Sequence, residues 1–280
     1  MNKKRFNQIA RDIKKIKIQG ARNIARAALN AYFLIPTANS IKFLKSLRPT
    51  EPMLEKVLDL VDKKPRKEII EHFDSAQVSI NKSVLNLIHS GDIIFTHCHS
   101  TNVINALIYS KKKGKKFQVY NTETRPLFQG RKTASDLKKA GIKVTMFVDS
   151  AIALAIEKEN RRDQVYANKI FLGADALLPQ GIINKIGSGL IAELAHNHKI
   201  PFYIVADSWK FTKKKLPIEN RSLNEIWDNA PKNIKMKNPA FEFVPKKYIS
   251  GIVTELGLMK YSEFVKIVSK LKHNTKLLKN

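Results

Sequence analysis

The chain has 280 residues, of which 43% are hydrophobic and 27% are charged, a balance typical of a folded globular protein rather than a disordered or fibrous one. Apolar runs such as residues 151–156 fall far short of the roughly 20 residues that a membrane span needs. Basic residues at the N-terminus are not followed by an apolar run of signal-peptide length. We therefore expect a soluble, cytoplasmic protein with no membrane partner.

The net charge is strongly positive, because 51 Lys and Arg outnumber 24 Asp and Glu and give +27. Such a field attracts anions, including nucleic acids and phosphorylated small molecules. A lysine bias across the whole proteome is an equally open explanation. The Lys-rich stretches at 111–116 and 213–215 carry no interleaved aromatic residues, which disfavours binding of single strands through base stacking. Charge alone leaves nucleic-acid binding open.

Residues 7–90 carry the apolar spacing of helices. Apolar side chains recur at three- and four-residue intervals from Ile13 to Tyr32 and again from Ile69 to Ile88. Gly20 interrupts the first run, and prolines divide the sequence between the two runs. We predict a small N-terminal helical domain over residues 1–89.

After Gly91 the pattern changes to short β-branched and aromatic runs that alternate with amphipathic stretches. The predicted strands are residues 93–97, 117–121, 143–148, 169–173, 202–206 and 251–254, and the predicted helices are 101–113, 133–140, 151–157 and 187–198. This alternation predicts a parallel sheet with right-handed crossovers. The predicted fold class is α/β, with the helical domain followed by a doubly wound, mainly parallel, Rossmann-like domain over 90–280 that holds the active site.

Polar or reactive side chains follow nearly every predicted strand, at the edge where such sheets bind ligands. They are His97, Cys98, His99, Ser100, Asn121, Glu123, Arg125, Asp149, Ser150, Asp175, Asp207, Ser208 and Lys210. A solvated loop edge would also be polar, but it explains less well why the sole cysteine directly follows a buried-looking strand. Neither a P-loop nor a G-x-G-x-x-G motif follows the first strand, which disfavours classic nucleotide binding.

A single cysteine excludes an intramolecular disulfide and a cysteine-rich metal site. His97 and His99 flank Cys98, but a metal would need a third ligand at a workable spacing. We therefore predict no metal, and favour a thiol tuned by histidine or plain strand-end residues.

Cys98 and Asp175 are the candidate reactive pair. Cys98 opens the helix that begins near Thr101, where the helix dipole and basic neighbours are expected to lower the pKa of the thiol. The resulting thiolate could serve as a base or nucleophile, although a lone cysteine is more often structural. Asp175 ends a neighbouring predicted strand, where burial would raise its carboxyl pKa and suit it to general-acid catalysis; its alternative is a turn residue. Asn184 and Lys185 precede a helix, a setting that suits a phosphate.

Several motifs occur in order along the chain: residues 96–100 (THCHS), 122–126 (TETRP), 173–175 (GAD), 181–187 (GIINKIG) and 254–257 (TELG). Together they resemble the family that unites archaeal ribose-1,5-bisphosphate isomerase, methylthioribose-1-phosphate isomerase and the alpha, beta and delta subunits of translation initiation factor 2B. The resemblance is closest to the ribose-1,5-bisphosphate isomerases. The isomerases of the family carry a Cys and an Asp at the positions of Cys98 and Asp175, whereas the regulatory subunits generally lack this pair, so the pair favours the enzyme branch.

The resemblance implies a sugar-phosphate aldose-ketose isomerase that converts ribose 1,5-bisphosphate to ribulose 1,5-bisphosphate in nucleotide salvage. Cys98 would remove a proton from the sugar carbon next to the reacting centre, and Asp175 would protonate the ring oxygen. The sequence leaves open whether the hydrogen moves as a proton or as a hydride. The implied substrate contacts are Gly20, Ala21, Arg22, Asn23, Arg48, Ser100, Thr101, Asn184, Lys185 and Lys210. No metal or organic cofactor is implied.

Two other functions remain open. One is a non-catalytic regulatory subunit that resembles initiation factor 2B and binds a nucleotide or a sugar phosphate, and the other is an isomerase of methylthioribose 1-phosphate. Gln19, where the isomerases usually carry Arg, and Glu51, where they carry small or apolar residues, favour the regulatory subunit. Cys98 with Asp175 favours the enzyme. The resemblance also implies a homodimer or larger oligomer, and it leaves a nucleotide activator open.

Overall fold

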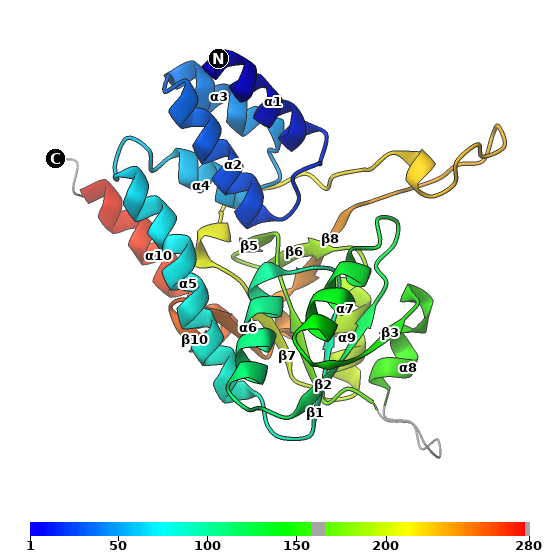
Figure 1. Ribbon diagram of the computed structural model, residues 1–280. Coiled ribbons are helices and arrows are strands. Elements are labelled where there is room, and N and C mark those ends of the chain that lie inside the picture. The colour runs from blue at the N-terminus through cyan, green and yellow to red at the C-terminus, as the bar shows by residue number, and fades with distance from the viewer. Residues whose placement is uncertain (158–165, 278–280) are drawn as a thin grey trace.

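The computed structural model describes residues 1–157 and 166–277, and these form a helical bundle set against an α/β body (Figure 1). The bundle contains α1 (Asn2–Lys14), α2 (Ala21–Leu34), α3 (Ala38–Leu47) and α4 (Pro52–Leu58). The longer α5 (Arg66–Leu87) runs from the bundle to the body: Ile69 and Phe73 pack with the bundle, whereas Ile80 and Val84 pack with the sheet. The periodicity of the first 90 residues therefore predicts their helices correctly.

The central sheet has seven strands in the order β10-β9-β7-β4-β1-β2-β3, and all neighbours are parallel except β10 and β9. The strands are β1 (Asp92–Thr96), β2 (Phe117–Thr122), β3 (Lys143–Phe147), β4 (Lys169–Leu172), β7 (Phe202–Val205), β9 (Gly251–Thr254) and β10 (Gly257–Met259). All six strands predicted from the sequence form, each within one residue at either end. The strand order reverses between β1 and β4, so this pair is the topological switch point of a doubly wound sheet.

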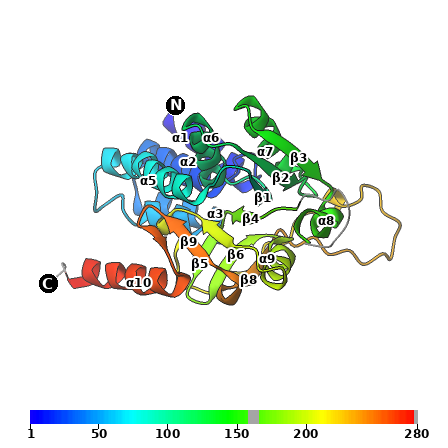
Figure 2. The same ribbon diagram turned by 90° about the horizontal axis from the view of Figure 1, so that it is seen from below.

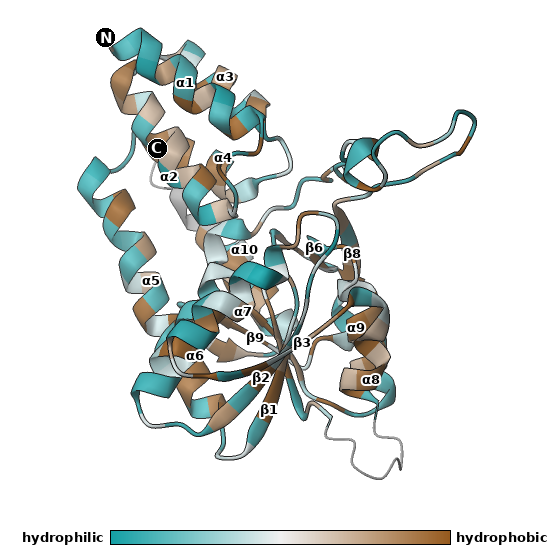
Figure 3. Cartoon of the chain, turned by 45° about the vertical axis from the view of Figure 1, so that its right-hand side comes forward, coloured by the Kyte–Doolittle hydropathy of each residue, from teal (hydrophilic) through white to brown (hydrophobic). Residues whose placement is uncertain are grey.

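Helices cover both faces of this sheet (Figure 2). On one face lie α5, α6 (Thr101–Lys112) and α7 (Gln129–Lys139), and on the other lie α8 (Ile152–Ile156), α9 (Ser188–Asn197) and α10 (Tyr261–Leu277). Neighbouring residues of β1 point to opposite cores, with Ile94 in the first and Phe95 in the second. The central strands β1, β4, β7 and β9 are correspondingly rich in hydrophobic residues, as buried parallel strands are (Figure 3). No helix in the described ranges is long and apolar enough to span a membrane.

A second, antiparallel sheet was not predicted from the sequence. It contains β5 (Ala176–Leu178), β6 (Gly181–Lys185) and β8 (Phe241–Pro245), in the order β5-β6-β8. Its first two strands form a hairpin directly after β4, so the chain turns back toward the carboxyl edge of the main sheet before α9 begins. Between β7 and β8 a long excursion with little regular structure projects from the body (Figure 1).

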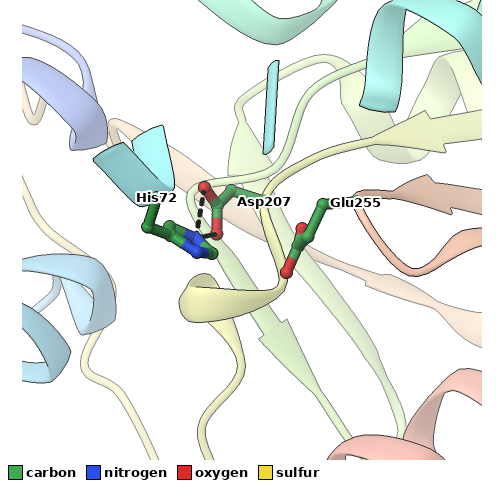
Figure 4. Close-up of side chains that lie close together, drawn as sticks. All are labelled: His72, Asp207 and Glu255. Atoms are coloured by element: carbon green, nitrogen blue, oxygen red, sulfur yellow. Dashed lines mark hydrogen bonds and ion pairs between the residues drawn. The ribbon is translucent and has the colours of Figure 1, made fainter. Parts of the chain in front are cut away.

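A side-chain cluster of His72, Asp207 and Glu255 fastens α5 to the carboxyl edge of the sheet (Figure 4). The Nε2 atom of His72 lies 3.1 and 3.2 Å from the two carboxylate oxygens of Asp207, and its ring stacks on Trp209 with centroids 3.5 Å apart. Glu255 accepts the backbone N–H of Ser208 at 3.0 Å. These contacts fix the short 3-10 helix η2 (Ser208–Lys210), which ends in Lys210.

A buried ion pair joins the two strands at the switch point. Lys169 Nζ lies 2.6 Å from Asp92 Oδ2, and both side chains are less than a tenth exposed. Asp92 also accepts hydrogen bonds from the backbone N–H of His89 at 2.8 Å and from the amide of Asn168 at 3.1 Å. The carboxylate is therefore fully used, and the pair sets the start of β1 against the start of β4.

We expect Asp92→Asn to lower the free energy of unfolding by about 3–5 kcal/mol, because it leaves the Lys169 charge buried without its partner. Urea unfolding followed by circular dichroism measures the change. Glu71→Gln is the matched control: it breaks an exposed pair with Lys67 and should cost less than about 1 kcal/mol. Equal stability of Asp92→Asn and the wild type would show that this pair does not hold the strands together.

Candidate active site

A cavity of about 570 Å³ opens at the carboxyl edge of the main sheet, where α2 and the segment before α4 face the ends of β1 and β4. Its lining contains every residue that the sequence analysis assigned to catalysis or substrate contact: Gly20, Ala21, Arg22, Asn23, Arg48, Cys98, Ser100, Thr101, Asp175, Asn184, Lys185 and Lys210. Residues up to 190 positions apart thus share one space, built from the bundle, the main sheet and the small antiparallel sheet.

The cavity lining also includes charged residues that the sequence analysis did not assign. Lys132, Asp136 and Lys139 lie on α7 at positions that share one helical face, a spacing that could have revealed them. Glu219 and Arg221 come from the irregular excursion before β8, where no local periodicity marks them. The charge of the cavity is therefore set partly by segments that sequence patterns do not place.

Cys98 sits at the end of β1 in a left-handed backbone conformation, with φ of +64°. Its backbone N–H donates to Thr124 Oγ1 at 3.0 Å, and its carbonyl accepts the Thr133 hydroxyl at 2.7 Å. His99 Nδ1 lies 3.0 Å from the same Thr133 oxygen, to which it can donate. A non-glycine residue at positive φ is strained, so the two threonines hold the peptide of Cys98 in a conformation it would not adopt alone.

The Cys98 thiol does not have the lowered pKa expected from the start of α6. Burial is the largest cause that raises its pKa to about 12, followed by the negative charge of Asp175. The backbone N–H of His99 and the charge of Lys185 lower the pKa by less, and the charge of Asp149 makes the smallest contribution to the rise. The prediction of a lowered pKa is therefore wrong, because desolvation outweighs the effect of the helix start. At neutral pH Cys98 carries its proton.

Asp175 follows β4 and lies beside Asn184 of β6. When the Asn184 amide is oriented to satisfy both its ends, its nitrogen donates to Asp175 Oδ2 and to the Gly173 carbonyl at 3.3 Å each, and its oxygen accepts from Ser188 Oγ at 2.8 Å. Burial raises the pKa of Asp175, and the nearby charges of Lys210, Arg48 and Lys185 oppose this rise. The direction agrees with the sequence-based expectation, and it suits the carboxyl to hold and release a proton.

Three cationic side chains line the cavity around this pair. Lys210 Nζ donates to the carbonyl of Ala174 at 2.6 Å, and burial lowers the pKa of Lys185. Arg48 is 7% exposed, and its Nε and Nη1 have no hydrogen-bond partner among the described residues. Buried donors without acceptors are costly, so the Arg48 guanidinium is prepared for an anion.

Arg22 also lines the cavity, but its charge is already engaged. Its Nη2 lies 2.5 Å from Asp74 Oδ1, and its guanidinium lies over the ring of Phe73. Arg22 therefore contributes less free positive charge to the cavity than its place in the sequence suggested.

The histidines on either side of Cys98 have structural partners. His97 Nε2 donates to the carbonyl of Ile186 at 2.9 Å, and its Nδ1 pairs with the Thr122 hydroxyl. Burial lowers the pKa of His97 to about 4, so its ring is neutral. Within the described ranges, the group of metal-ligating side chains that come close together is the cluster of His72, Asp207 and Glu255, and none of these lines the cavity.

A glycine at the end of β4 makes room for the start of α6. A Cβ atom at Gly173 would lie 2.5 Å from Ser100 Oγ and 2.7 Å from Ser100 Cβ. Ser100 caps α6, so its position fixes the backbone amides at the start of that helix. The close approach of β4 and α6 therefore depends on the missing side chain of Gly173.

Comparison with known proteins gives the following matches. A sequence profile described as the initiation factor 2 subunit family matches residues 35–261. The ribose 1,5-bisphosphate isomerase of Methanocaldococcus jannaschii is 36% identical over an alignment that covers 88% of this chain and 89% of that protein. The crystal structure of Pyrococcus horikoshii translation initiation factor eIF-2B has a TM-score of 0.79 at 25% identity and covers 91% of this chain and 97% of that chain. The crystal structure of 5-methylthioribose 1-phosphate isomerase from the same organism has a TM-score of 0.75 at 25% identity, and the match covers 95% of this chain and 88% of that chain.

We expect Gly173→Ala to lower the free energy of unfolding by about 1–3 kcal/mol, because the new methyl group overlaps Ser100. Chemical denaturation measures the loss. The double variant Gly173→Ala with Ser100→Gly removes the overlapping atoms and should be more stable than Gly173→Ala combined with an unrelated exposed Ser→Gly change. Full stability of the single variant would mean that β4 and α6 can move apart without cost.

Alkylation of Cys98, the sole cysteine, tests the direction of its pKa shift. With a thiol pKa near 12 in the free protein, the rate with iodoacetamide should rise about tenfold per pH unit between pH 7 and pH 9 without reaching a plateau. Asp175→Asn removes a charge that raises this pKa, so it should speed the reaction. A plateau below pH 8 would contradict the raised pKa.

Proposed function

We propose a function for this chain, which belongs to the initiation factor 2 subunit family. It is a sugar-phosphate aldose-ketose isomerase that converts ribose 1,5-bisphosphate to ribulose 1,5-bisphosphate in nucleotide salvage. The observation that carries the proposal is the meeting of Cys98 and Asp175 in one cavity lined by cationic side chains. A cytoplasmic location follows from this role, because its substrate is a phosphorylated intermediate.

The reaction needs one positioned acid and one positioned base, because a sugar that carries phosphate on its anomeric oxygen does not open freely in water. The negative charge of Asp175 raises the pKa of the Cys98 thiol. Transfer of the thiol proton to the Asp175 carboxylate would produce both the acid and the base. The outcome is a protonated carboxyl and a strongly basic thiolate. The high thiol pKa thus fits a base that forms only when Cys98 transfers its proton to Asp175.

The subsequent steps conserve every proton. Asp175 gives its proton to the ring oxygen as the bond from that oxygen to C1 breaks. Cys98 takes the proton from C2, which leaves an enol with the phosphate still on C1. Cys98 then returns a proton to C1 while Asp175 accepts the hydroxyl proton from O2, so the ketone forms and the site is again a thiolate beside a protonated carboxyl. Return of the proton from Asp175 to Cys98 restores the resting thiol and carboxylate.

Arg48, Lys185 and Lys210 are the proposed partners of the phosphate groups. Each phosphate monoester carries about −1.5 to −2 charge at neutral pH, so two of them require several cations or amide donors. The residues at the starts of α2, near Gly20, and of α6, near Thr101, line the same cavity. The start of a helix carries backbone N–H groups without intrahelical partners, which are donors that suit an anion. The cavity therefore has anion-binding groups on more than one side.

We also propose that the protein acts as a homodimer or larger oligomer. The edge strand β3 exposes the apolar side chain of Met146, and Val148 and Leu154 are exposed in the segment that follows it. An unpaired strand edge with exposed apolar residues is a surface that a second copy can cover.

A non-catalytic regulatory protein is the second candidate. The observation that favours it is the Glu51 carboxyl in the cavity wall beside Arg48, where a charged carboxylate would compete with an anionic ligand for the guanidinium. A protein of this kind would bind a sugar phosphate or nucleotide without changing it.

Phosphorus and carbon NMR of the protein with ribose 1,5-bisphosphate, with and without AMP, separates the two candidates. We expect ribulose 1,5-bisphosphate to accumulate with the wild type, and Cys98→Ser and Asp175→Asn to lose at least about a thousandfold in kcat, because each removes a proton-transfer group. Asp59→Asn, an exposed carboxyl paired with Lys45, is the matched control and should keep full activity. An unchanged sugar whose phosphorus lines broaden would favour the regulatory protein.

A further inference from the structure

Glu51 and Arg48 form a buried pair in the cavity wall whose hydrogen-bonding capacity is only partly used. Glu51 is 3% exposed; its Oε1 accepts from Arg48 Nη2 at 3.2 Å, while its Oε2 has no partner among the described residues. The same Nη2 donates to Glu219 Oε2 at 3.0 Å, which leaves Nε and Nη1 of Arg48 unpartnered. Two residues of the cavity lining therefore hold one unused acceptor and two unused donors between them.

The surroundings of Glu51 disfavour its ionised form, and Arg48 already contacts the carboxylate of Glu219. Arg48 and Lys210 attract its negative charge, whereas Asp175 and Glu219 repel it, and burial removes the water that would stabilise it. Together these effects raise the pKa of Glu51 to about 8, with burial as the largest cause. At neutral pH this carboxyl is therefore mostly protonated.

An anion that docks on Arg48 adds negative charge beside Glu51. A carboxylate there would face the anion across a short distance in a site with little water, which is unfavourable. A protonated carboxyl would instead turn its O–H toward the anion, so that Oε2 becomes a donor and its lack of a partner is removed. Oε1 would continue to accept from Arg48 Nη2.

We propose that Glu51 is a substrate-binding residue that works in its neutral form and donates a hydrogen bond to a phosphate held on Arg48, so that this subsite takes up its anion together with a proton. The inference rests on the proposed function only for the identity of the phosphate ester. Because the anion binds when Glu51 is protonated, the affinity of this subsite should fall as pH rises. Above pH 8 most Glu51 carboxyls are ionised and must take up a proton when the anion binds. Glu219, which shares Arg48 Nη2 but is more exposed, has no such role.

Isothermal titration calorimetry of the full chain with inorganic phosphate, and of the Cys98→Ser protein with ribose 1,5-bisphosphate, tests this proposal between pH 7 and pH 9. We expect affinity to be about tenfold weaker at pH 9 than at pH 7, and binding at pH 9 to take up close to one proton, measured in two buffers of different ionisation enthalpy. Glu51→Gln keeps a donor and an acceptor without the charge, so its affinity should change less than about twofold over this range.

Glu219→Gln is the matched control on the same guanidinium. The Glu219 charge raises the pKa of Glu51, so its removal should shift the loss of affinity to lower pH without abolishing it. Any proton uptake that belongs to Lys185 is common to all the proteins, so the difference between wild type and Glu51→Gln isolates Glu51. If Glu51→Gln does not fold, the wild type and Glu219→Gln still supply both readouts.

The outcomes separate this inference from the proposed function. Binding of both ligands with the same pH dependence in wild type and Glu51→Gln would overturn the role of Glu51 and leave the isomerase intact. Binding of inorganic phosphate with the expected proton uptake, but no binding of ribose 1,5-bisphosphate, would support Glu51 and remove the proposed substrate. Failure of the wild type to bind either ligand would overturn the inference.

Discussion

The parallel pairing of β1 with β4 is the constraint on which the rest of the site depends. Their register places Ile94 beside Lys169 and Phe95 beside Ile170, so both strands end at the same edge of the sheet. The sequence order of the strands reverses at this pair, and the segments that follow them diverge to opposite faces. The space between those segments is where Cys98 and Asp175 meet, and the hairpin of β5 and β6 adds Asn184 and Lys185 from the side.

Burial favours the neutral form of five ionisable groups in this space. It raises the pKa values of Cys98, Asp175 and Glu51, and it lowers those of His97 and Lys185. The resting cavity is therefore closer to neutral than its residue types suggest, and Cys98 and Glu51 hold protons there. Chemistry that moves protons between neighbouring carbons needs such a store of protons away from water, whereas a surface that binds RNA through exposed lysines does not.

The sequence predicts the scaffold well because each central strand is a short apolar run bounded by turn residues, and such runs indicate buried parallel strands. The hairpin of β5 and β6 was missed because β5 has three residues and its turn, Pro179 to Gly181, resembles a loop. All the site residues that the resemblance assigned line one cavity of the structure. The predicted direction of the Cys98 pKa shift is wrong, because desolvation depends on the whole surrounding fold. Glu219 reaches Arg48 from 171 residues away, which no local pattern reveals.

The central claim is that the cavity moves hydrogen between the first two carbons of a phosphorylated sugar, and a label at C2 tests it most directly. We would incubate ribose 1,5-bisphosphate deuterated at C2 with the wild-type protein and follow the label by NMR and mass spectrometry. The account predicts that deuterium leaves C2 during ribulose 1,5-bisphosphate formation, with loss to solvent as the mark of exchange at the Cys98 thiol. Retention of all deuterium at C2, with the sugar unchanged, would contradict the account.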